Sequence, residues 1–265
     1  MRKIVTLWKD TGQTPLQAIE LWKQEHPEYA NIPASYAGRL DPMAEGKLLV
    51  LLGDECKRQK SYHGLDKEYQ IEVLLDLSSD TGDVLGMPEY ADRNTAPSNE
   101  ELRIALRFET GTKTVPYPAF SSKTVNGKPL FQYALEGTLD TIAIPEHNEA
   151  IHSIHLLEVG SMQKEELAER IDTTLLLAPR SNQPSKILGA DFRQDAIRTG
   201  WRAVFDQIPD RSYTILTLKV SCGSGTYMRT LAERIGKDLG TRALALSIKR
   251  TRVGRYLPFF RLWFR

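Results

Sequence analysis

One carboxylate, Asp41, stands between Leu40 and Pro42 inside the stretch 36–46, whose residue pattern is too irregular for a regular helix or strand. A carboxylate on a rigid loop can hold a nucleophile or a base at fixed geometry over a cleft. Asp before Pro also has an ordinary structural use, as a helix N-cap or turn residue with Pro preset for the first helical position. The residue types alone therefore leave two interpretations of Asp41 open, a catalytic carboxylate and a capping or turn residue.

Other residue types that carry chemistry are sparse in this sequence. His147, His152 and His155 lie near one another, but no Cys or carboxylate set accompanies them, so we interpret them as surface or strand residues. The run 223–226, Gly-Ser-Gly-Thr before a predicted helix, could be the phosphate loop of a nucleotide-using enzyme. It lacks the Lys-Ser/Thr ending of such loops. We therefore expect no metal and no cofactor.

The composition is that of an ordinary globular protein, with 41% hydrophobic and 26% charged residues among 265. A chain of this length can bury a substantial core. No apolar run is long enough to span a bilayer, and the N-terminus lacks the apolar core of a signal peptide. Two cysteines, Cys56 and Cys222, give neither a disulfide framework nor a zinc quartet, and we expect both to be buried. These features predict a cytoplasmic protein without membrane contact.

The net charge of +1 conceals an uneven distribution. Between Lys237 and Arg265 the sequence has eight basic residues, and Asp238 is the only acidic one. A basic patch of this kind can neutralise backbone phosphates and give salt-dependent binding to nucleic acid. A solvated charged face would have the same composition. The charge pattern leaves both interpretations open.

Hydrophobic periodicity predicts a mixture of strands and helices. A Thr-Pro-Leu-Gln capping box at Thr14 opens a helix that we expect to bury Leu16, Ile19 and Trp22. The other predicted elements are strands at 4–8, 47–52, 67–77, 213–220, 244–249 and 252–256, a capping box at 98–101, a hairpin turn at 126–127 and a helix over 225–239. Hairpins without a glycine-rich βαβ fingerprint favour an α+β fold over a doubly wound one.

The stretch 36–46 is similar to the motif Gly-x-Leu-Asp-Pro-x-Ala-x-Gly of the bacterial TruB family of tRNA pseudouridine synthases, and every fixed residue matches from Gly38 to Gly46. Further segments resemble other motifs of the family in the same order along the chain. They are 9–14, 52–57, 67–69, 80–83, 119–130 and 225–231. Their order and spacing are specific, although no single motif is decisive.

The resemblance implies a fold, a reaction and catalytic residues. The fold would be the pseudouridine synthase fold, a central mixed, largely antiparallel sheet flanked by helices. The reaction would isomerise uridine to pseudouridine in RNA, at uridine 55 in the T loop of tRNA, after the base is flipped out and without a cofactor. Asp41 would take the role of the essential aspartate, either as a nucleophile at C1′ or as a base at C2′. Arg229 would pair with Asp41, and Tyr69 would stack on the target base; an ordinary helix-surface arginine and a core tyrosine are the alternatives.

The resemblance also implies residues that contact RNA. Tyr36 stands where the family commonly has a histidine beside the flipped nucleotides, and Ile248 matches an apolar pocket residue. The remaining RNA-binding candidates are Arg39, Lys57, Lys123, Lys249 and Arg250. The T arm of tRNA would be the partner, with no obligatory protein partner. The alternatives are a non-catalytic RNA-binding or RNA-chaperone protein that keeps the fold, and a synthase that acts on a different RNA.

One region departs from the family pattern. We predict a single catalytic domain over 1–265 with a helical insertion at about 162–211, made of helices near 163–178 and 191–207, and without a separate C-terminal RNA-binding module. The candidates for RNA contact in the insertion are Arg193, Arg198, Arg202 and Arg211. Structural packing is the interpretation we favour for these arginines, because charged residues on an amphipathic helix need no ligand.

Overall fold

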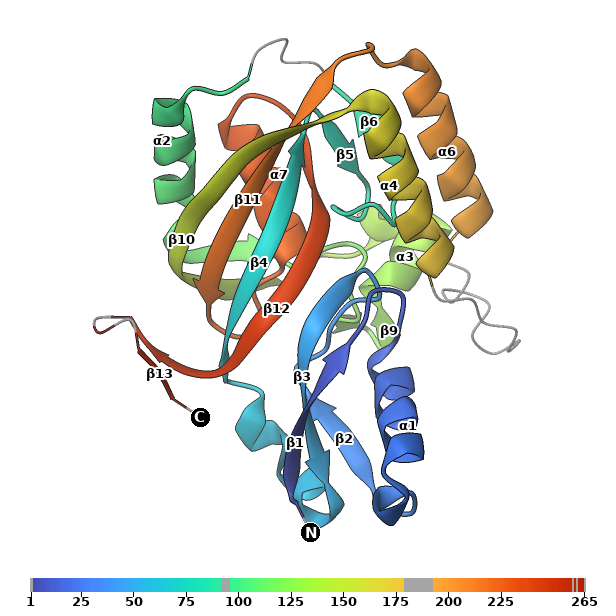
Figure 1. The fold of residues 1–265 in the computed structure, drawn as a ribbon, viewed down its shortest axis with the longest axis vertical. Helices are drawn as coiled ribbons and strands as arrows, with labels where there is room; N and C mark the ends of the chain where they lie inside the picture. Colours follow the sequence, from blue (N-terminus) through green and yellow to red (C-terminus); the bar gives the residue numbers. More distant parts are fainter. Residues whose placement is uncertain (1, 92–95, 179–192, 259, 261, 265) are drawn as a thin grey trace.

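The computed structural model describes residues 2–258 apart from 92–95 and 179–192, and beyond them residues 260 and 262–264. Nine of the described strands form one mixed sheet, in the order β1, β3, β12, β4, β11, β10, β7, with β2 paired to β3 and β13 paired to β12 (Figure 1). Strands β3 and β12 run parallel, and the other neighbours in the sheet are antiparallel. The predicted α+β fold with a mixed, largely antiparallel sheet is confirmed.

The strands of this sheet are β1 (Ile4–Lys9), β2 (Ala34–Ala37), β3 (Ala44–Leu52), β4 (Asp66–Leu75), β7 (Gly111–Pro116), β10 (Glu146–Gln163), β11 (Ser212–Cys222), β12 (Ala243–Leu257) and β13 (Leu262–Phe264). Two short hairpins lie outside it, β5 (Leu77–Ser79) with β6 (Pro88–Tyr90) and β8 (Thr124–Val125) with β9 (Lys128–Pro129). The second hairpin turns at Asn126 and Gly127, which both have positive φ (+50° and +81°), as two-residue hairpin turns require. The turn predicted at 126–127 is therefore confirmed.

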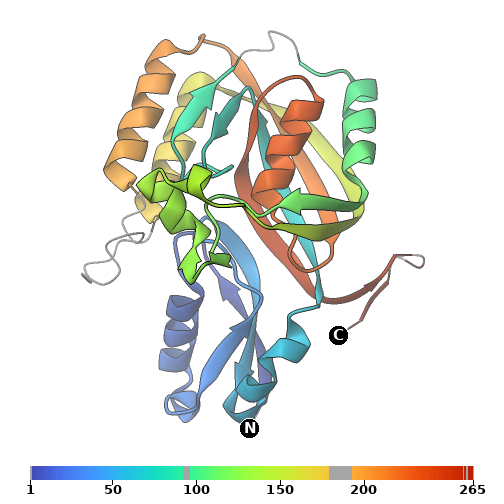
Figure 2. The ribbon, with the colours of Figure 1, turned by 180° about the vertical axis from the view of Figure 1, so that it is seen from behind.

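The described α-helices are α1 (Pro15–Glu25), α2 (Asn99–Glu109), α3 (Leu130–Glu136), α4 (Lys164–Leu177), α6 (Gln194–Gln207) and α7 (Met228–Asp238). Helices α7 and α2 lie side by side on one face of the sheet, in front of it in Figure 2. Helices α4 and α6 pack against each other, and α6 also contacts β6 (Figure 1). The two helices predicted between 163 and 207 are thus present, and the segment joining them lies outside the described residues.

Two hydrophobic clusters form the core. The larger one lies around β4, β11 and β12 and includes the inner faces of α4, α6 and α7. The smaller one lies between α1 and strands β1 and β3, and contains Val5, Ala18, Ile19, Leu48 and Val50. The stretch that carries Asp41 leads from β2 into β3, and its residues Leu40, Met43 and Ala44 belong to the larger cluster.

Local signals at the helix starts are confirmed. Thr14 and Ser98 each accept a hydrogen bond from the backbone N–H three residues on, and the side chains of Gln17 and Glu101 bond back to the caps. Such caps stabilise a helix by roughly 1 kcal/mol each. The expected burial of Ile19 is confirmed and Trp22 is partly buried, but the expected burial of Leu16 is wrong, because this side chain is 55% exposed.

The predicted strand pair 244–249 and 252–256 is also wrong, because the two segments form the single strand β12. The register against β4 shifts between Arg250 and Arg252, so Thr251 is an extra bulge residue rather than a hairpin turn. Cys222 is buried as expected, whereas Cys56 is only half-buried. Among the described residues, no helix has the length and apolarity needed to cross a bilayer.

Candidate active site

Asp41 lies on the short loop between β2 and β3. Gly38 enters this loop with φ +80°, a conformation that suits glycine. The loop turns at Asp41, whose carbonyl accepts from the Ala44 N–H at 3.0 Å, and Gly12 donates to the Pro42 carbonyl at 2.8 Å. The strand β3 follows the loop, so Asp41 is not a helix N-cap, but the bond from Ala44 shows that Asp41 does have the other structural use, that of a turn residue. Its side chain is 37% exposed, which leaves the carboxylate accessible.

Two buried cations fix the loop through its carbonyl groups. The Lys9 ammonium donates to the carbonyls of Ala44, Asp10 (3.1 Å) and Pro42 (3.4 Å). Burial lowers the pKa of Lys9 to about 8, partly offset by the nearby Asp41 carboxylate. The Lys9 side chain therefore holds the loop from the β1 side and adds a positive charge beneath Asp41.

Arg250 holds the other side of the loop, and the prediction that it binds RNA is wrong in this structure. The side chain is fully buried, and its three nitrogens donate to the carbonyls of Lys47 (2.7 Å), Gly38 (3.1 Å) and Arg39 (3.2 Å). A guanidinium that is enclosed and fully hydrogen-bonded cannot reach a phosphate. Sequence spacing could not show this, because the acceptors lie more than 200 residues away.

Arg229, in the first turn of α7, is the partner of Asp41. Its Nε donates to Asp41 Oδ2 at 2.9 Å, its Nη1 to the Thr81 carbonyl at 2.6 Å and its Nη2 to the Phe120 carbonyl at 3.2 Å. A second carboxylate, Asp83, lies 3.6 Å from Nε. The Arg229 side chain is only 6% exposed. The predicted pairing is therefore confirmed, and the alternative of a helix-surface arginine is wrong.

Burial dominates the electrostatics around Arg229. Desolvation by burial would lower the pKa of Arg229, but the charges of Asp41 and Asp83 outweigh it and raise that pKa, so the guanidinium stays charged. Burial raises the pKa of Asp83 against the opposing charge of Arg229, and it raises the pKa of Glu233 to about 7. Burial and then the Asp41 charge also raise the pKa of the Tyr227 hydroxyl. The site thus combines one permanent cation with several carboxyl groups.

The role of Asp83 beside Arg229 was missed by the sequence analysis. The only signal was the position of Asp83 in the segment 80–83, one of those that match the family. Asp83 Oδ1 accepts from the Thr81 hydroxyl (2.8 Å) and from the Leu85 N–H (2.9 Å). These bonds orient the carboxylate toward Arg229.

Tyr69 lies on β4 opposite Arg250 of β12 and is 8% exposed. Its neighbour Ile248 is 4% exposed and pairs with Ala44, just past the Asp41 loop. Burial raises the pKa of Tyr69. The structure thus brings Tyr69 and Ile248 to the side of the sheet next to the Asp41 loop, while stacking of Tyr69 on a base stays a prediction.

The other RNA-binding candidates fall into two groups. Arg39 is exposed beside Asp41 and donates to the Ser122 hydroxyl at 3.2 Å, and Lys123 lies 4.8 Å from the Tyr117 ring centroid, so this group borders the site. Lys249 pairs with Glu45 at 3.3 Å on the strands that leave the loop.

The second group consists of Lys57, on the helix that follows β3, and Tyr36, on the strand β2 that leads into the Asp41 loop. Lys57 is 81% exposed on the 3-10 helix Gly53–Tyr62 and pairs with Asp54. Tyr36 is half-buried on β2 and packs against the smaller core cluster, which shows a structural use for this ring. RNA contact by either residue stays a prediction.

Several of the described basic residues between 237 and 265 are buried or lie beside acidic residues. Arg242 pairs with Glu89, and Arg252 lies 3.4 Å from Glu68. Arg250 is buried, and Arg261 and Arg265 lie outside the described residues. Acidic residues from other segments thus neutralise part of this charge, which the sequence distribution could not indicate.

An aromatic cluster lies next to Arg229. The rings of Tyr117 and His147 stack with centroids 4.0 Å apart, and Tyr227 meets both rings edge-on at 6.3 and 5.8 Å. His147, His152 and His155 all lie on β10, as expected for strand residues, and the described residues contain no group of three metal ligands.

The loop 223–226 is engaged by the protein itself. The Gly223 N–H donates to the Ala150 carbonyl at 2.7 Å, and the Ser224 hydroxyl accepts from Lys67 at 2.9 Å. These contacts use the groups that would face a phosphate, and they argue against a phosphate loop.

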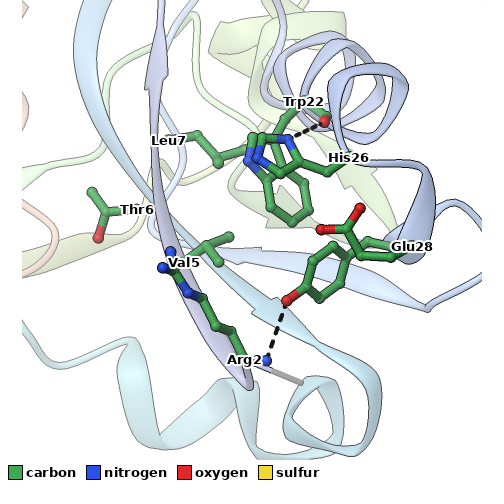
Figure 3. Close-up of a pocket in the computed structure, with 8 residues that line it drawn as sticks. Arg2, Val5, Thr6, Leu7, Trp22, His26 and Glu28 are labelled. Atoms are coloured by element: carbon green, nitrogen blue, oxygen red, sulfur yellow. Dashed lines mark hydrogen bonds between the residues drawn. The ribbon is translucent and has the colours of Figure 1, made fainter.

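A separate cavity of about 260 Å³ lies between β1 and the end of α1 (Figure 3). Trp22 and His26 stack there with centroids 4.6 Å apart, and the Arg2 N–H donates to the Tyr29 hydroxyl at 3.3 Å. The residues lining it are Arg2, Val5, Thr6, Leu7, Trp22, His26, Glu28 and Tyr29. Asp41 and Arg229 are not among them, so this cavity is distinct from the candidate active site.

Comparisons with known proteins show the family to which the chain belongs. The family model for the TruB family pseudouridylate synthase (N terminal domain) matches residues 30–173, more than half of the chain. The tRNA pseudouridine synthase B of Listeria innocua is 30% identical over 255 residues, which cover 96% of this chain and 67% of that protein. The same-named protein of Cupriavidus metallidurans is 28% identical over 222 residues, covering 83% of this chain and 54% of that protein. The chain thus spans about one half to two thirds of the length of these relatives.

Solved structures share the fold. A chain in the crystal structure of a Cbf5–Nop10–Gar1 complex superimposes with a TM-score of 0.54 at 17% identity, covering 95% of this chain and 48% of that chain. The archaeal box H/ACA sRNP Nop10–Cbf5 complex gives a TM-score of 0.51 at 16% identity, covering 95% and 47%. At this identity the likeness shows a common fold, and it confirms the predicted one.

Proposed function

Because the chain belongs to the TruB family of pseudouridylate synthases, enzymes that isomerise uridine to pseudouridine, we propose that it modifies tRNA at uridine 55 of the T loop. The observation that carries the proposal is the pairing of Asp41 with the buried Arg229 at 2.9 Å on a loop fixed by Lys9 and Arg250. A non-catalytic RNA-binding protein would have no need for an oriented, accessible carboxylate with its own buried counter-ion.

The reaction breaks the N-glycosidic bond, rotates the base and rejoins C1′ to C5 of the same base. Substrate and product are isomers, so the net change besides the new bond is the loss of the C5 proton and the gain of a proton at N1. No oxidant, reductant or external energy source is needed. Asp41 starts the reaction either by attack at C1′ or by removal of the C2′ proton. Its Oδ2 is held by Arg229, and we assign the other oxygen, Oδ1, to the sugar.

Arg229 has two tasks in this proposal. Its charge favours the ionised form of Asp41, and its Nε fixes the plane of the carboxylate through a charge-assisted hydrogen bond. The Thr81 and Phe120 carbonyls hold the other two nitrogens, so the guanidinium cannot turn away when the substrate binds. Holding the reacting group in one geometry is a main source of rate enhancement.

The uridine must leave the loop stack to reach Asp41, at a cost of roughly a few kcal/mol. Tyr69 and Ile248 form the apolar side of the base pocket in this proposal, and the Tyr69 ring stacks on the flipped base. Arg39 and Lys123 contact the RNA backbone near the site, Lys249 and Lys57 contact it farther out, and Tyr36 stacks beside the flipped nucleotide.

We further propose that the enzyme works in the cytoplasm without a cofactor or an obligatory protein partner. The experiment that tests the function is incubation of the protein with an unmodified tRNA transcript, followed by mapping of pseudouridine. Conversion at position 55 that persists in EDTA supports the proposal. Conversion of another RNA only would indicate a different target, and tight binding without conversion would indicate a non-catalytic RNA-binding protein.

The control for this assay is Asp41→Asn, which keeps the size of the side chain and removes its charge. We expect it to abolish turnover and to leave tRNA affinity within about tenfold of wild type, because the carboxylate acts in the chemical step rather than in docking. A folded variant with wild-type turnover would contradict the assignment of Asp41.

A further inference from the structure

Helix α6 reaches the candidate active site through the residue that precedes it. Arg193 caps α6 with its backbone in the left-handed conformation (φ +56°). Its Nη1 donates to Asp80 Oδ2 at 2.7 Å, and its guanidinium carbon lies 4.7 Å from the centroid of the Phe120 ring. The Arg193 and Asp80 side chains are only 30% and 35% exposed. Arg193 is thus held by two groups from segments far away in the sequence.

These two segments are the ones that bind Arg229. Asp80 immediately precedes Thr81, whose carbonyl accepts from Arg229 Nη1, and the Phe120 carbonyl accepts from Arg229 Nη2. Arg229 therefore binds the two segments through their backbone carbonyls. Arg193 binds the same two segments through a carboxylate and an aromatic ring. Any shift of Asp80 or Phe120 would move the acceptors that orient Arg229 toward Asp41.

A second contact from α6 supports the turn that contains Asp80 and Thr81. Trp201 is 1% exposed, and its Nε1 donates to the Val84 carbonyl at 3.0 Å, directly after Asp83. One residue earlier, Gly200 lets the helix approach closely, since a Cβ there would lie 3.2 Å from Met87 and Pro88 atoms. The turn 80–88 is thus covered by α6, beside β5 and β6 (Figure 1).

The turn also contacts α7 directly. A Cβ added at Gly82 would lie 3.2 Å from the Arg229 Cβ, so the backbone of the turn packs on that arginine. The Gly82 carbonyl accepts from the Ala245 N–H of β12 at 2.9 Å. Contacts from α6, α7 and β12 therefore fix one turn, which carries Asp83 and the Thr81 carbonyl.

We infer that α6 is a positioning element of the catalytic site and that Arg193 is its positioning residue, which holds the Thr81 and Phe120 carbonyls in place for Arg229. The inference gives a role to the helical region that was predicted as an insertion. Its part that concerns turnover rests on the proposed function. Asp80 neutralises the Arg193 charge, so contact with an RNA phosphate is the weaker interpretation.

The test compares Arg193→Ala with Arg103→Ala, a matched control that removes an arginine from an exposed ion pair, with Glu100 on α2. Single-turnover rates are measured at saturating tRNA, together with tRNA affinity. We expect Arg193→Ala to slow the reaction by about tenfold or more with affinity unchanged within about threefold, because small displacements of catalytic groups are costly. Arg103→Ala should leave both quantities unchanged. Arg193→Lys keeps the charge opposite Asp80 and should recover part of the rate.

Loss of tRNA affinity with an unchanged saturated rate would overturn the inference, since it would make Arg193 a phosphate contact. A saturated rate equal to wild type would overturn it as well. A double-mutant cycle with Asp80→Asn should be non-additive, because both changes remove one ion pair. Additive effects of the two substitutions would contradict the coupling between Arg193 and Asp80.

Hydrogen exchange of the free protein gives a readout that needs no substrate. The Gly82 N–H, which donates to the Ser79 carbonyl at 3.1 Å, should exchange faster in Arg193→Ala and at the wild-type rate in Arg103→Ala. Equal exchange in both variants would overturn the inference even if the enzyme modifies tRNA as proposed. If the wild-type protein converts no tRNA, the proposed function fails, and the exchange experiment still decides whether Arg193 holds the turn.

Discussion

The substitution Arg229→Lys tests the geometry of the site more sharply than removal of the side chain. Lysine keeps the positive charge but has one nitrogen in place of the planar guanidinium, so it cannot face three acceptors in one plane. If its ammonium takes the place of Nε near Asp41, the donors to the Thr81 and Phe120 carbonyls, now at 2.6 and 3.2 Å, are lost. The lysine ammonium and the Asp41 carboxylate are then still paired, but the orientation of the pair is no longer fixed.

The expected loss of reaction rate follows from the two lost hydrogen bonds. Hydrogen bonds to a charged group contribute about 1.5 to 3 kcal/mol each, so their loss amounts to about 3 to 6 kcal/mol. The Arg229 side chain is 6% exposed, so water can replace little of that loss. If the bonds act fully in the transition state, the rate should fall between about a hundredfold and ten-thousandfold, at about 1.4 kcal/mol for each factor of ten.

The assay is single-turnover pseudouridine formation at saturating tRNA, with thermal unfolding to check the fold. Arg103→Lys is the matched control, because it makes the same change in an exposed pair with Glu100 and should leave the rate unchanged. Arg229→Ala should be slower still than Arg229→Lys, since it leaves Asp83 buried beside no cation. A folded Arg229→Lys enzyme within about threefold of the wild-type rate would refute the argument that planar, multi-acceptor geometry matters.

Three further predictions concern charge and pH. Lys249→Glu should weaken tRNA binding and lower the slope of log affinity against log salt by about one; an unchanged slope would show that Lys249 contacts no phosphate. Arg250→Met should instead lower the free energy of unfolding by at least about 3 kcal/mol in denaturant titrations, because three buried carbonyls lose their donors; a wild-type unfolding midpoint would contradict its structural role. Burial raises the pKa of Glu233 from 4.5 to about 7, so the folded state binds this proton more tightly than the unfolded state. The contribution of Glu233 to stability is therefore present below pH 4.5 and is lost as the pH rises to about 7. Glu233→Gln should remove that part of the pH dependence. Identical curves of stability against pH for wild type and variant would show that Glu233 makes no such contribution.

The sequence by itself determined the elements whose signals act over a few residues. The capping boxes at Thr14 and Ser98 and the hairpin turn at Asn126 depend on bonds and backbone angles within four residues, so they could be predicted and are confirmed. The motif around Asp41 indicated the family, which supplied Arg229 as a partner that periodicity alone would have left on the helix surface.

Prediction was poorer where the environment of a residue depends on distant segments. Leu16 was expected in the core, but the orientation of α1 on β1 leaves it exposed. The segments on either side of Thr251 were separated into two strands, because a bulge and a turn look alike until the partner strand is known. Residue type and local spacing do not contain this information.

The tertiary structure alone decided which charges are buried and which groups they meet. Arg250 and Lys249 are adjacent in the sequence, yet one is enclosed by carbonyls near Asp41 and the other lies near the surface beside Glu45. The pairs of Asp83 with Arg229 and of Asp80 with Arg193 likewise join segments more than 100 residues apart. Local sequence fixes how far a side chain can reach and which bonds it can form. The free energy of a charge depends on its burial and its partners, and only the packing of the whole chain sets those.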